Sequence, residues 1–106
     1  LQYTTKKLKR GYESTINIEK LEEMKKQGAV IIDVRSEQEF KEGHIEGAIS
    51  IPEYEIENRI KNEIPYLEQT IVVYCGTGHR SKRAQKLLEK IGYNHVYNLE
   101  NGWQNY

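Results

Sequence analysis

Hydrophobic and polar residues follow two different periods along this chain, and the period changes from one stretch to the next. Two runs, Ala29–Ile32 and Ile71–Tyr74, are apolar at every position. A run without alternation is typical of a strand that is covered on both faces of a sheet. Two segments that mix apolar and polar residues, 48–51 and 95–98, predict two further brief strands.

Between these runs the apolar residues recur at helical spacing. Asn17 predicts a helix N-cap, and Gly28 predicts the end of that helix. Ser36 followed three residues later by Glu39 has the spacing of a capping box, which opens a second, short helix. Regularly spaced isoleucines predict a third helix that Pro65 closes, and a stripe of alanine, leucine and isoleucine predicts a fourth. These last two helices are expected over residues 54–64 and 81–91.

Strands that alternate with helices predict an α/β fold around a parallel sheet. No repeat, low-complexity segment or linker divides the chain, so the sequence predicts one domain over residues 14–106. The polar residues 1–13 are expected to form an arm, which is interpreted as solvated, with the remnant of a membrane-proximal anchor as the alternative. The arm carries a basic cluster made of Lys6, Lys7, Lys9 and Arg10.

Composition narrows the class of protein. The 106 residues carry 16 basic and 16 acidic side chains, so bulk charge indicates neither nucleic acid nor a membrane surface as a partner. A single cysteine excludes an internal disulfide framework and favours a reducing, cytoplasmic compartment. No apolar run approaches the ~20 residues of a membrane span. Because the chain begins at Leu1, a membrane partner is expected only if a further N-terminal segment anchors it.

The single cysteine, Cys75, stands directly after the second buried run and before a loop that contains Gly76 and Gly78. A strand, a glycine-bearing loop and a helix in that order direct several backbone N–H groups toward one point, and the helix dipole adds positive potential there. A thiol at such a point titrates below its ordinary pKa of ~8.5 and becomes a nucleophile. We therefore predict that Cys75 is a catalytic thiolate open to solvent rather than a buried structural thiol.

Basic residues follow the loop at the start of a helix, where the dipole favours acidic side chains instead. Arg80 is expected to form the floor of an anion site, because its planar guanidinium matches a tetrahedral oxyanion. His79 is expected to face solvent, with a general base as the alternative. Arg35, at the end of the neighbouring strand, either reaches the same pocket or forms a structural ion pair, and the sequence leaves both open.

Three other residues are expected to be structural. Asp33 is expected to anchor loops through hydrogen bonds, His44 to be packed and hydrogen-bonded, and Trp103 to belong to the core. One cysteine and three scattered histidines lack the spacing of metal ligands, so neither a metal nor another cofactor is predicted.

Four segments in order resemble the rhodanese family of single-domain sulfurtransferases. The segments are Ile32–Arg35, Gly43–Pro52, the loop Cys75–Ser81, and Gly92–Leu99. Each segment alone is weakly specific, whereas four at family-like spacing are highly specific, and together they extend over nearly the whole chain. The family commonly has a glycine pair before the final tryptophan, where this chain has Asn101-Gly102.

The resemblance implies a sheet of about five mostly parallel strands with helices on both faces. It also implies transfer of sulfane sulfur from a small anionic donor such as thiosulfate to a thiol or a protein acceptor, through a persulfide on Cys75. The donor would be bound by the loop and its surroundings. The expected substrate-binding residues are Gly76, Thr77, Gly78, His79, Arg80, Ser81 and Arg35.

Two other functions remain open. Cysteine phosphatases and arsenate reductases also place a cysteine before an arginine, but the phosphatases use a longer loop than the four residues between Cys75 and Arg80. A non-catalytic module that docks proteins or carries persulfide is the second alternative. Inactive relatives usually lose the cysteine that this chain keeps.

Overall fold

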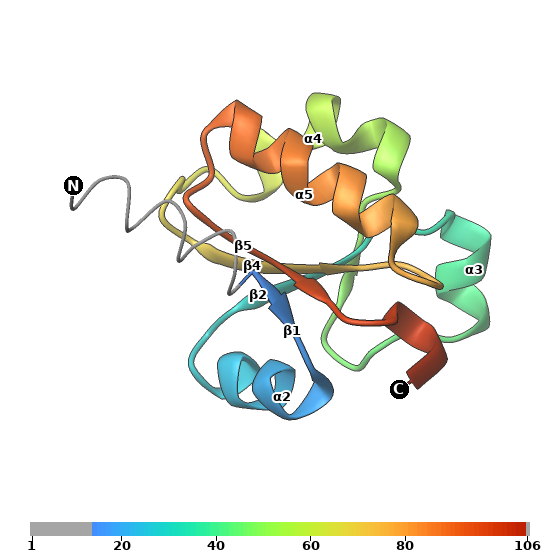
Figure 1. The fold of residues 1–106 in the computed structure, drawn as a ribbon. Coiled ribbons are helices and arrows are strands. Elements are labelled where there is room, and N and C mark those ends of the chain that lie inside the picture. Colours follow the sequence, from blue (N-terminus) through green and yellow to red (C-terminus); the bar gives the residue numbers. More distant parts are fainter. Residues whose placement is uncertain (1–13, 106) are drawn as a thin grey trace.

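The computed structural model describes residues 14–105 (Figure 1). The arm expected over residues 1–13 lies outside the described residues. Within the described part, no helix has both the length and the apolar character that crossing a membrane requires. The elements in chain order are β1 Thr15–Ile16, α2 Ile18–Lys26, β2 Val30–Asp33, α3 Glu37–Glu42, β3 Ile49–Ser50, η1 Glu53–Glu55, α4 Ile56–Glu63, β4 Thr70–Tyr74, α5 His79–Ile91, β5 His95–Leu99 and η2 Gly102–Asn105.

The five strands form one sheet in the order β1-β5-β4-β2-β3, and every neighbouring pair is parallel. This confirms the α/β fold with a parallel sheet. Because β2 and β4 are neighbours in the sheet, with Asp33 opposite Tyr74, their carboxyl ends meet at the same edge. Ligands of open α/β sheets bind beyond such ends. The topology therefore places the segment that follows Asp33 beside Cys75.

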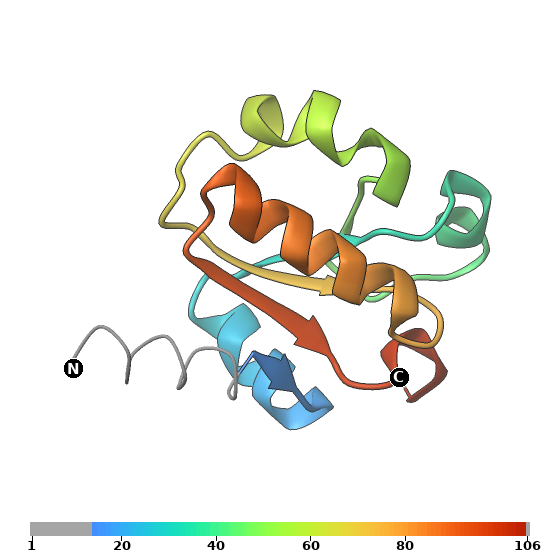
Figure 2. The same ribbon diagram turned by 45° about the horizontal axis from the view of Figure 1, so that its top comes forward.

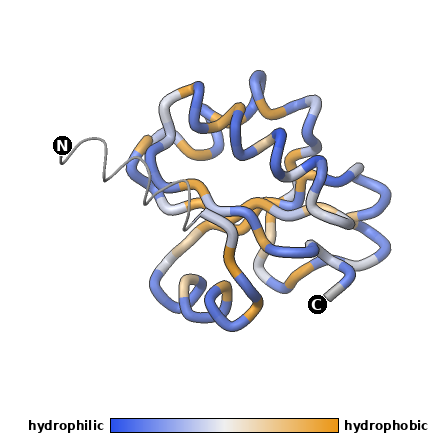
Figure 3. The backbone as a smooth tube through the Cα atoms, in the orientation of Figure 1, coloured by the Kyte–Doolittle hydropathy of each residue, from blue (hydrophilic) through white to orange (hydrophobic). Residues whose placement is uncertain are grey.

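Two hydrophobic clusters cover the two faces of the sheet (Figures 1 and 2). On one face, α4 and α5 pack on β2, β4 and β5 with fully buried side chains such as Ile60 and Leu88. On the other face, α2 contributes Leu21 and Met24, which pack against Val72 and Leu99. The central strands β2 and β4 are mostly apolar, whereas the helices are mostly polar with apolar residues at intervals (Figure 3). Coverage on both faces explains why β2 and β4 show no alternation.

Two of the predicted helix starts depend on local capping, and both are confirmed. The Asn17 side chain accepts a hydrogen bond from the Lys20 amide at 2.8 Å. In the capping box, Ser36 Oγ accepts from the Glu39 amide at 3.1 Å, and Glu39 Oε1 accepts from the Ser36 amide at 3.0 Å. Both bonds satisfy amides that a helix end leaves unpaired.

The main differences from the prediction concern two helices and one strand. The last long helix begins at His79 rather than at residue 81, so Arg80 and Ser81 belong to its first turn. The stretch expected as one helix over 54–64 begins as a separate 3-10 turn, η1. The sequence also missed β1, which is only two residues long and exists because Thr15 and Ile16 pair with Asn98 and Leu99 of β5.

Candidate active site

The loop after β4 turns the chain from the sheet into α5 within four residues, 75–78. Gly78 makes this turn with a φ of +105°, in the left-handed region that side chains with a Cβ avoid. Its position is also the N-cap of α5, and no side chain caps that helix. The first amides of α5 are therefore left to another acceptor, which lies inside the loop.

That acceptor is the sulfur of Cys75. The Gly78 amide donates to Sγ at 3.0 Å, and the Ser81 amide lies at 3.4 Å from it. The Ser81 hydroxyl is also 3.4 Å from Sγ. Burial raises the pKa of the Cys75 thiol, but hydrogen bonds from the Ser81 side chain and from the Ser81, Gly78 and Thr77 amides outweigh it and leave the pKa below the ordinary value. The predicted convergence of amides on the thiol is confirmed.

Two carbonyl groups of the loop, those of Cys75 and Gly76, accept hydrogen bonds from η2. The Trp103 amide donates to the Cys75 carbonyl at 2.7 Å, and the Gln104 amide to the Gly76 carbonyl at 3.4 Å. This contact depends on Gly102, because a Cβ there would lie 2.2 Å from the Cys75 carbonyl oxygen. The C-terminal turn thus holds the peptide between Gly76 and Thr77, and the Thr77 amide is one of the groups that lower the pKa of Cys75.

The expectation that the sulfur is open to solvent is wrong. Cys75 is 0% exposed and packs with the cluster under α4 and α5. The reason is that the loop closes over the sulfur: Gly78 and Ser81 are buried too, while Thr77 and His79 face solvent. A reaction partner reaches Sγ only when the loop or a side chain moves.

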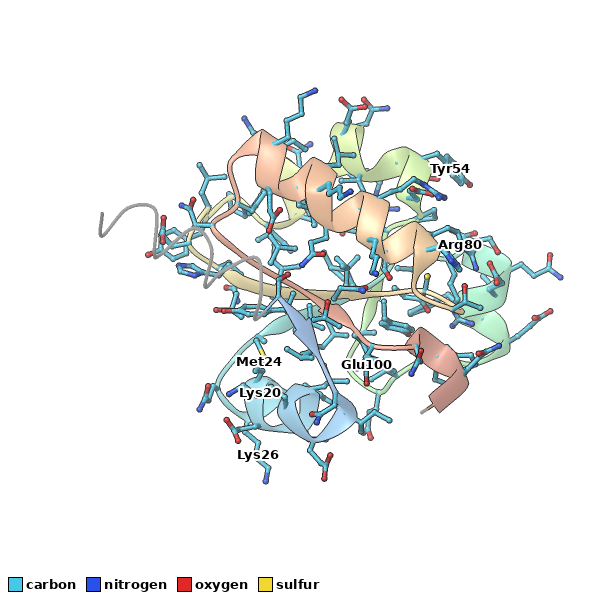
Figure 4. All side chains as sticks on the ribbon, in the orientation of Figure 1. Lys20, Met24, Lys26, Tyr54, Arg80 and Glu100 are labelled. Carbon is cyan, nitrogen blue, oxygen red and sulfur yellow. The ribbon has the colours of Figure 1, made fainter. Side chains whose placement is uncertain are left out.

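Arg80 lies on the first turn of α5 at the end that faces α3 (Figure 4). Its Nη1 and Nη2 bind the two carboxylate oxygens of Glu39 at 2.9 and 3.2 Å. Its Nη2 also lies 3.5 Å from where a Cβ on Gly76 would stand, so the guanidinium borders the loop. The hydrogen bonds from Arg80, with further bonds from Ser36, lower the pKa of Glu39 to about 2. The sequence singled out Glu39 for its capping box but missed this ion pair.

Other basic residues near the loop are partly neutralised. Arg83 pairs with Glu53 of η1 through bonds of 2.7 and 3.0 Å. Lys82 is exposed. His79 is exposed as predicted, and its Nδ1 lies 3.0 Å from the Thr77 hydroxyl. The environment of the sulfur is therefore built mainly from backbone amides rather than from unpaired cations.

Arg35 forms the structural ion pair, which was one of the two roles left open. Its Nε and Nη2 donate to the Asp33 carboxylate at 2.7–3.1 Å, and Nη2 also donates to the Gly43 carbonyl at 2.6 Å. The guanidinium carbon lies 5.7 Å from the Tyr74 ring centre and 5.1 Å from that of Trp103. Burial lowers the pKa of Arg35, but the bonds to Asp33 outweigh it and raise the pKa. The structure does not bring this side chain onto the loop.

Asp33 and His44, which were expected to be structural, both make hydrogen bonds to neighbouring residues. Asp33 anchors its surroundings, because it also accepts from the Arg35 amide at 2.9 Å and from the Tyr74 hydroxyl at 2.8 Å. The Ile45 amide donates to the same hydroxyl at 3.0 Å. His44 stacks on Phe40 at 3.7 Å and binds its carbonyl oxygen.

Among the described residues, a large hollow lies away from the loop, and no metal site adjoins it. A hollow of about 700 Å³ lies on the α2 face, where Lys20 and Met24 contribute to its wall (Figure 4), and no loop residue lines it. Among residues 14–105, no cluster of three histidine, cysteine, aspartate or glutamate side chains could hold a metal ion.

Comparison with known proteins gives a consistent family. A model described as the rhodanese-like domain matches residues 17–106. Thiosulfate sulfurtransferase PspE of Escherichia coli is 40% identical over 67 residues, which are 63% of this chain and 64% of PspE. Thiosulfate sulfurtransferase GlpE of Pseudomonas putida is 34% identical over 84 residues, covering 79% of this chain and 74% of GlpE. The chain spans 59–64% of the length of PspE and two other curated relatives.

The solved structure of the human single-domain sulfurtransferase TSTD1 matches with a TM-score of 0.77 at 28% identity, covering 86% of this chain and 92% of TSTD1. Its coverage includes most of the sheet and helices described above. With the sequence match over residues 17–106, this agreement shows that the chain belongs to the rhodanese-like domain family.

Proposed function

We propose that this chain is a sulfurtransferase that moves sulfane sulfur through a persulfide on Cys75. The observation that carries the proposal is the convergence of the Gly78 and Ser81 amides on Sγ at the N-terminus of α5. Such an arrangement stabilises an anionic sulfur both before and after a second sulfur is attached. The names of PspE and GlpE support the same chemistry.

The first half-reaction loads the thiolate. Cys75 Sγ attacks the outer sulfur of a donor such as thiosulfate, a new S–S bond forms, and the donor's own S–S bond breaks. The electron pair of the broken bond leaves with sulfite. Charge is conserved, because a thiolate and a dianionic donor give a monoanionic persulfide and dianionic sulfite, and no oxidant is required.

The second half-reaction unloads the sulfur. A thiophile such as cyanide or a thiolate attacks the outer sulfur of the persulfide, and Cys75 leaves as the thiolate that the loop amides stabilise. Because Sγ is buried in the resting loop, each half-reaction includes a movement that admits the partner. The two steps share one covalent intermediate, so ping-pong kinetics are expected.

Mass spectrometry of the intact protein after incubation with thiosulfate tests the proposal. The wild type should gain the mass of one sulfur atom, cyanide should remove it, and Cys75→Ser should gain nothing. Double-reciprocal plots at several acceptor concentrations should run parallel.

Three outcomes would contradict the proposal. Absence of an adduct with every sulfane donor would favour the docking role, and intersecting plots would exclude the two-step scheme. Hydrolysis of an aryl phosphate by the wild type but not by Cys75→Ser would favour phosphatase chemistry.

A further inference from the structure

The guanidinium nearest the loop is already occupied. Arg80 uses Nη1 and Nη2 for a two-point pair with the Glu39 carboxylate, and Nη2 lies 3.5 Å from where a Cβ on Gly76 would stand. Paired forks of this kind are geometrically specific and stronger than neutral hydrogen bonds. Any anion that enters beside Cys75 thus meets an arginine whose charge a fixed carboxylate has matched.

A second hydrogen bond holds the Glu39 carboxylate in place beside Arg80. Its Oε1 accepts from the Ser36 amide at 3.0 Å as well as from Arg80 Nη1 at 2.9 Å, so the same oxygen closes the capping box of α3. Rotation of Glu39 away from Arg80 would also break this cap. The depressed pKa of Glu39, about 2, keeps the carboxylate ionised at ordinary working pH.

A second carboxylate acts in the same direction. Glu53 binds the next arginine of α5, Arg83, at 2.7 and 3.0 Å. Arg80 and Arg83, at the start of α5, are thus both paired with carboxylates. The positive charge that this end of the helix presents to an incoming anion is therefore reduced. A dianion needs more compensation than a monoanion does, so this arrangement penalises a dianion more.

We propose that Glu39 is a specificity-determining residue, which by occupying Arg80 selects monoanionic sulfane donors, such as persulfides of other molecules, over dianionic thiosulfate. The inference rests on the proposed sulfurtransferase function. With an ionised persulfide donor, R–S–S⁻, Cys75 Sγ attacks the outer sulfur, the S–S bond of the donor breaks, and RS⁻ leaves with the electron pair of that bond while the outer sulfur stays on Cys75 as the persulfide anion. Atoms and charge balance without a further reactant.

Two donors that differ by one charge make the test direct. Thiosulfate is a dianion that releases sulfite, and methanethiosulfonate is a monoanion of similar shape that releases methanesulfinate. The experiment measures kcat/KM for both donors in the wild type and in Glu39→Gln. Glutamine retains the capping box at this position, so α3 should stay folded. The matched control is Glu37→Gln, which removes the same charge from the same helix at an exposed residue paired with Lys41.

We expect Glu39→Gln to raise kcat/KM for thiosulfate on the order of tenfold, mainly through KM, since one nearby charge has this scale of effect. The value for methanethiosulfonate should change far less, and Glu37→Gln should change neither. The gain should shrink in an Arg80→Ala background, because the released guanidinium is the group that binds the extra charge. An unchanged ratio between the donors, an equal gain for both, or a full gain without Arg80 would each overturn the inference.

Binding measurements keep the inference testable apart from turnover. In a Cys75→Ser background, calorimetric titration with thiosulfate should give tighter binding when Glu39→Gln is added, and equal binding would contradict the role of Glu39. If the wild type transfers sulfur from neither donor, the proposed function itself fails. If it transfers sulfur but Glu39→Gln leaves the donor ratio unchanged, only the role of Glu39 fails.

Discussion

The carboxyl ends of β2 and β4 lie side by side in the sheet, yet they use their polar groups in opposite ways. After β2, Asp33 and Arg35 are buried and satisfy each other, and the aromatic rings of Tyr74 and Trp103 flank the guanidinium. After β4, backbone donors gather around one sulfur, Cys75 Sγ, which can change its bonding partners.

The comparison shows that an arginine close to the site is not necessarily free to bind a ligand, because its hydrogen-bond partners decide this. Arg35 stands at the edge where ligands of such sheets bind, but its donors are committed to Asp33 and the Gly43 carbonyl. The Arg80 side chain is 35% exposed, against 5% for Arg35, and Arg80 pairs with a partly exposed carboxylate. The β2 end therefore supplies a rigid floor, and chemistry is left to the β4 end. The following predictions would break or sharpen this distinction.

The largest effect is expected from Asp33→Ala, which leaves Arg35 buried without its carboxylate. Asp33 is 0% exposed and Arg35 5% exposed, so water cannot replace the lost partner. Breaking a buried ion pair from one side costs about 3–5 kcal/mol, a large part of the stability of a small domain. Urea unfolding measures this loss, and Lys41→Ala, in an exposed pair, should change little. A loss no larger than that control would show that the β2 end is not a rigid floor.

Gly102→Ala should have the next largest effect, because it pushes on the backbone that orients the loop. Gly102 has a φ of +56°, and its new Cβ would overlap the Cys75 carbonyl. A left-handed residue with a Cβ costs roughly 1–2 kcal/mol, and relieving a packing overlap about 1–3 kcal/mol more. We also expect the pKa of Cys75 to rise as the amides move.

Gly47→Ala is the matched control for this substitution. Gly47 also has a positive φ, +87°, but a Cβ there would meet no atom within 4 Å. It should lose stability without changing the titration of Cys75. If both variants leave the thiol pKa unchanged, η2 does not orient the loop.

A smaller effect is expected on the pH dependence of the unfolding free energy, and it arises from Cys75 at the end of β4. The pKa of Cys75 is lower in the folded chain than the ~8.5 of an unfolded cysteine. Such a group adds its full stability above the unfolded pKa and loses it as pH falls through the folded pKa. The difference in unfolding free energy between wild type and Cys75→Ser should therefore grow as pH rises from neutral toward ~9. A difference that stays constant across this window would mean that the loop does not favour the thiolate.

The smallest change we predict is in Ser81→Ala. The Ser81 hydroxyl lies 3.4 Å from Sγ and helps to lower the pKa of Cys75, while the Ser81 amide survives the substitution. The thiol pKa should rise partway toward its ordinary value, as followed by the ultraviolet absorbance of the thiolate. Thr77→Val is the control, because the Thr77 hydroxyl contacts His79 rather than the sulfur. Equal titration of wild type and Ser81→Ala would remove this hydroxyl from the site.

Features that depend on neighbours in sequence could be predicted from the sequence. Asn17 caps α2, Ser36 and Glu39 form a capping box, and the loop after Cys75 turns its amides inward, all through contacts within six residues. The two uninterrupted apolar runs likewise identified the central strands, because burial on both faces removes alternation.

Features that depend on distant segments could not be predicted in this way. Glu39 and Arg80 are 41 residues apart, and nothing local marks them as partners. The same holds for β1, which exists only because β5 offers it a free edge, and for Gly102, whose missing Cβ matters only beside Cys75. The prediction that the sulfur is exposed to solvent was wrong for the same reason, because burial depends on how the loop closes over the sulfur in three dimensions.

The closed loop has a consequence for the chemical lifetime of the protein. A thiolate exposed to peroxide proceeds to sulfenic and then to irreversible sulfinic acid unless a second thiol intercepts it, and susceptibility follows exposure. These 106 residues contain no second cysteine. Burial of Sγ under the closed loop therefore limits oxidation of this thiol, and a loop that opened more readily would expose the sulfur to peroxide.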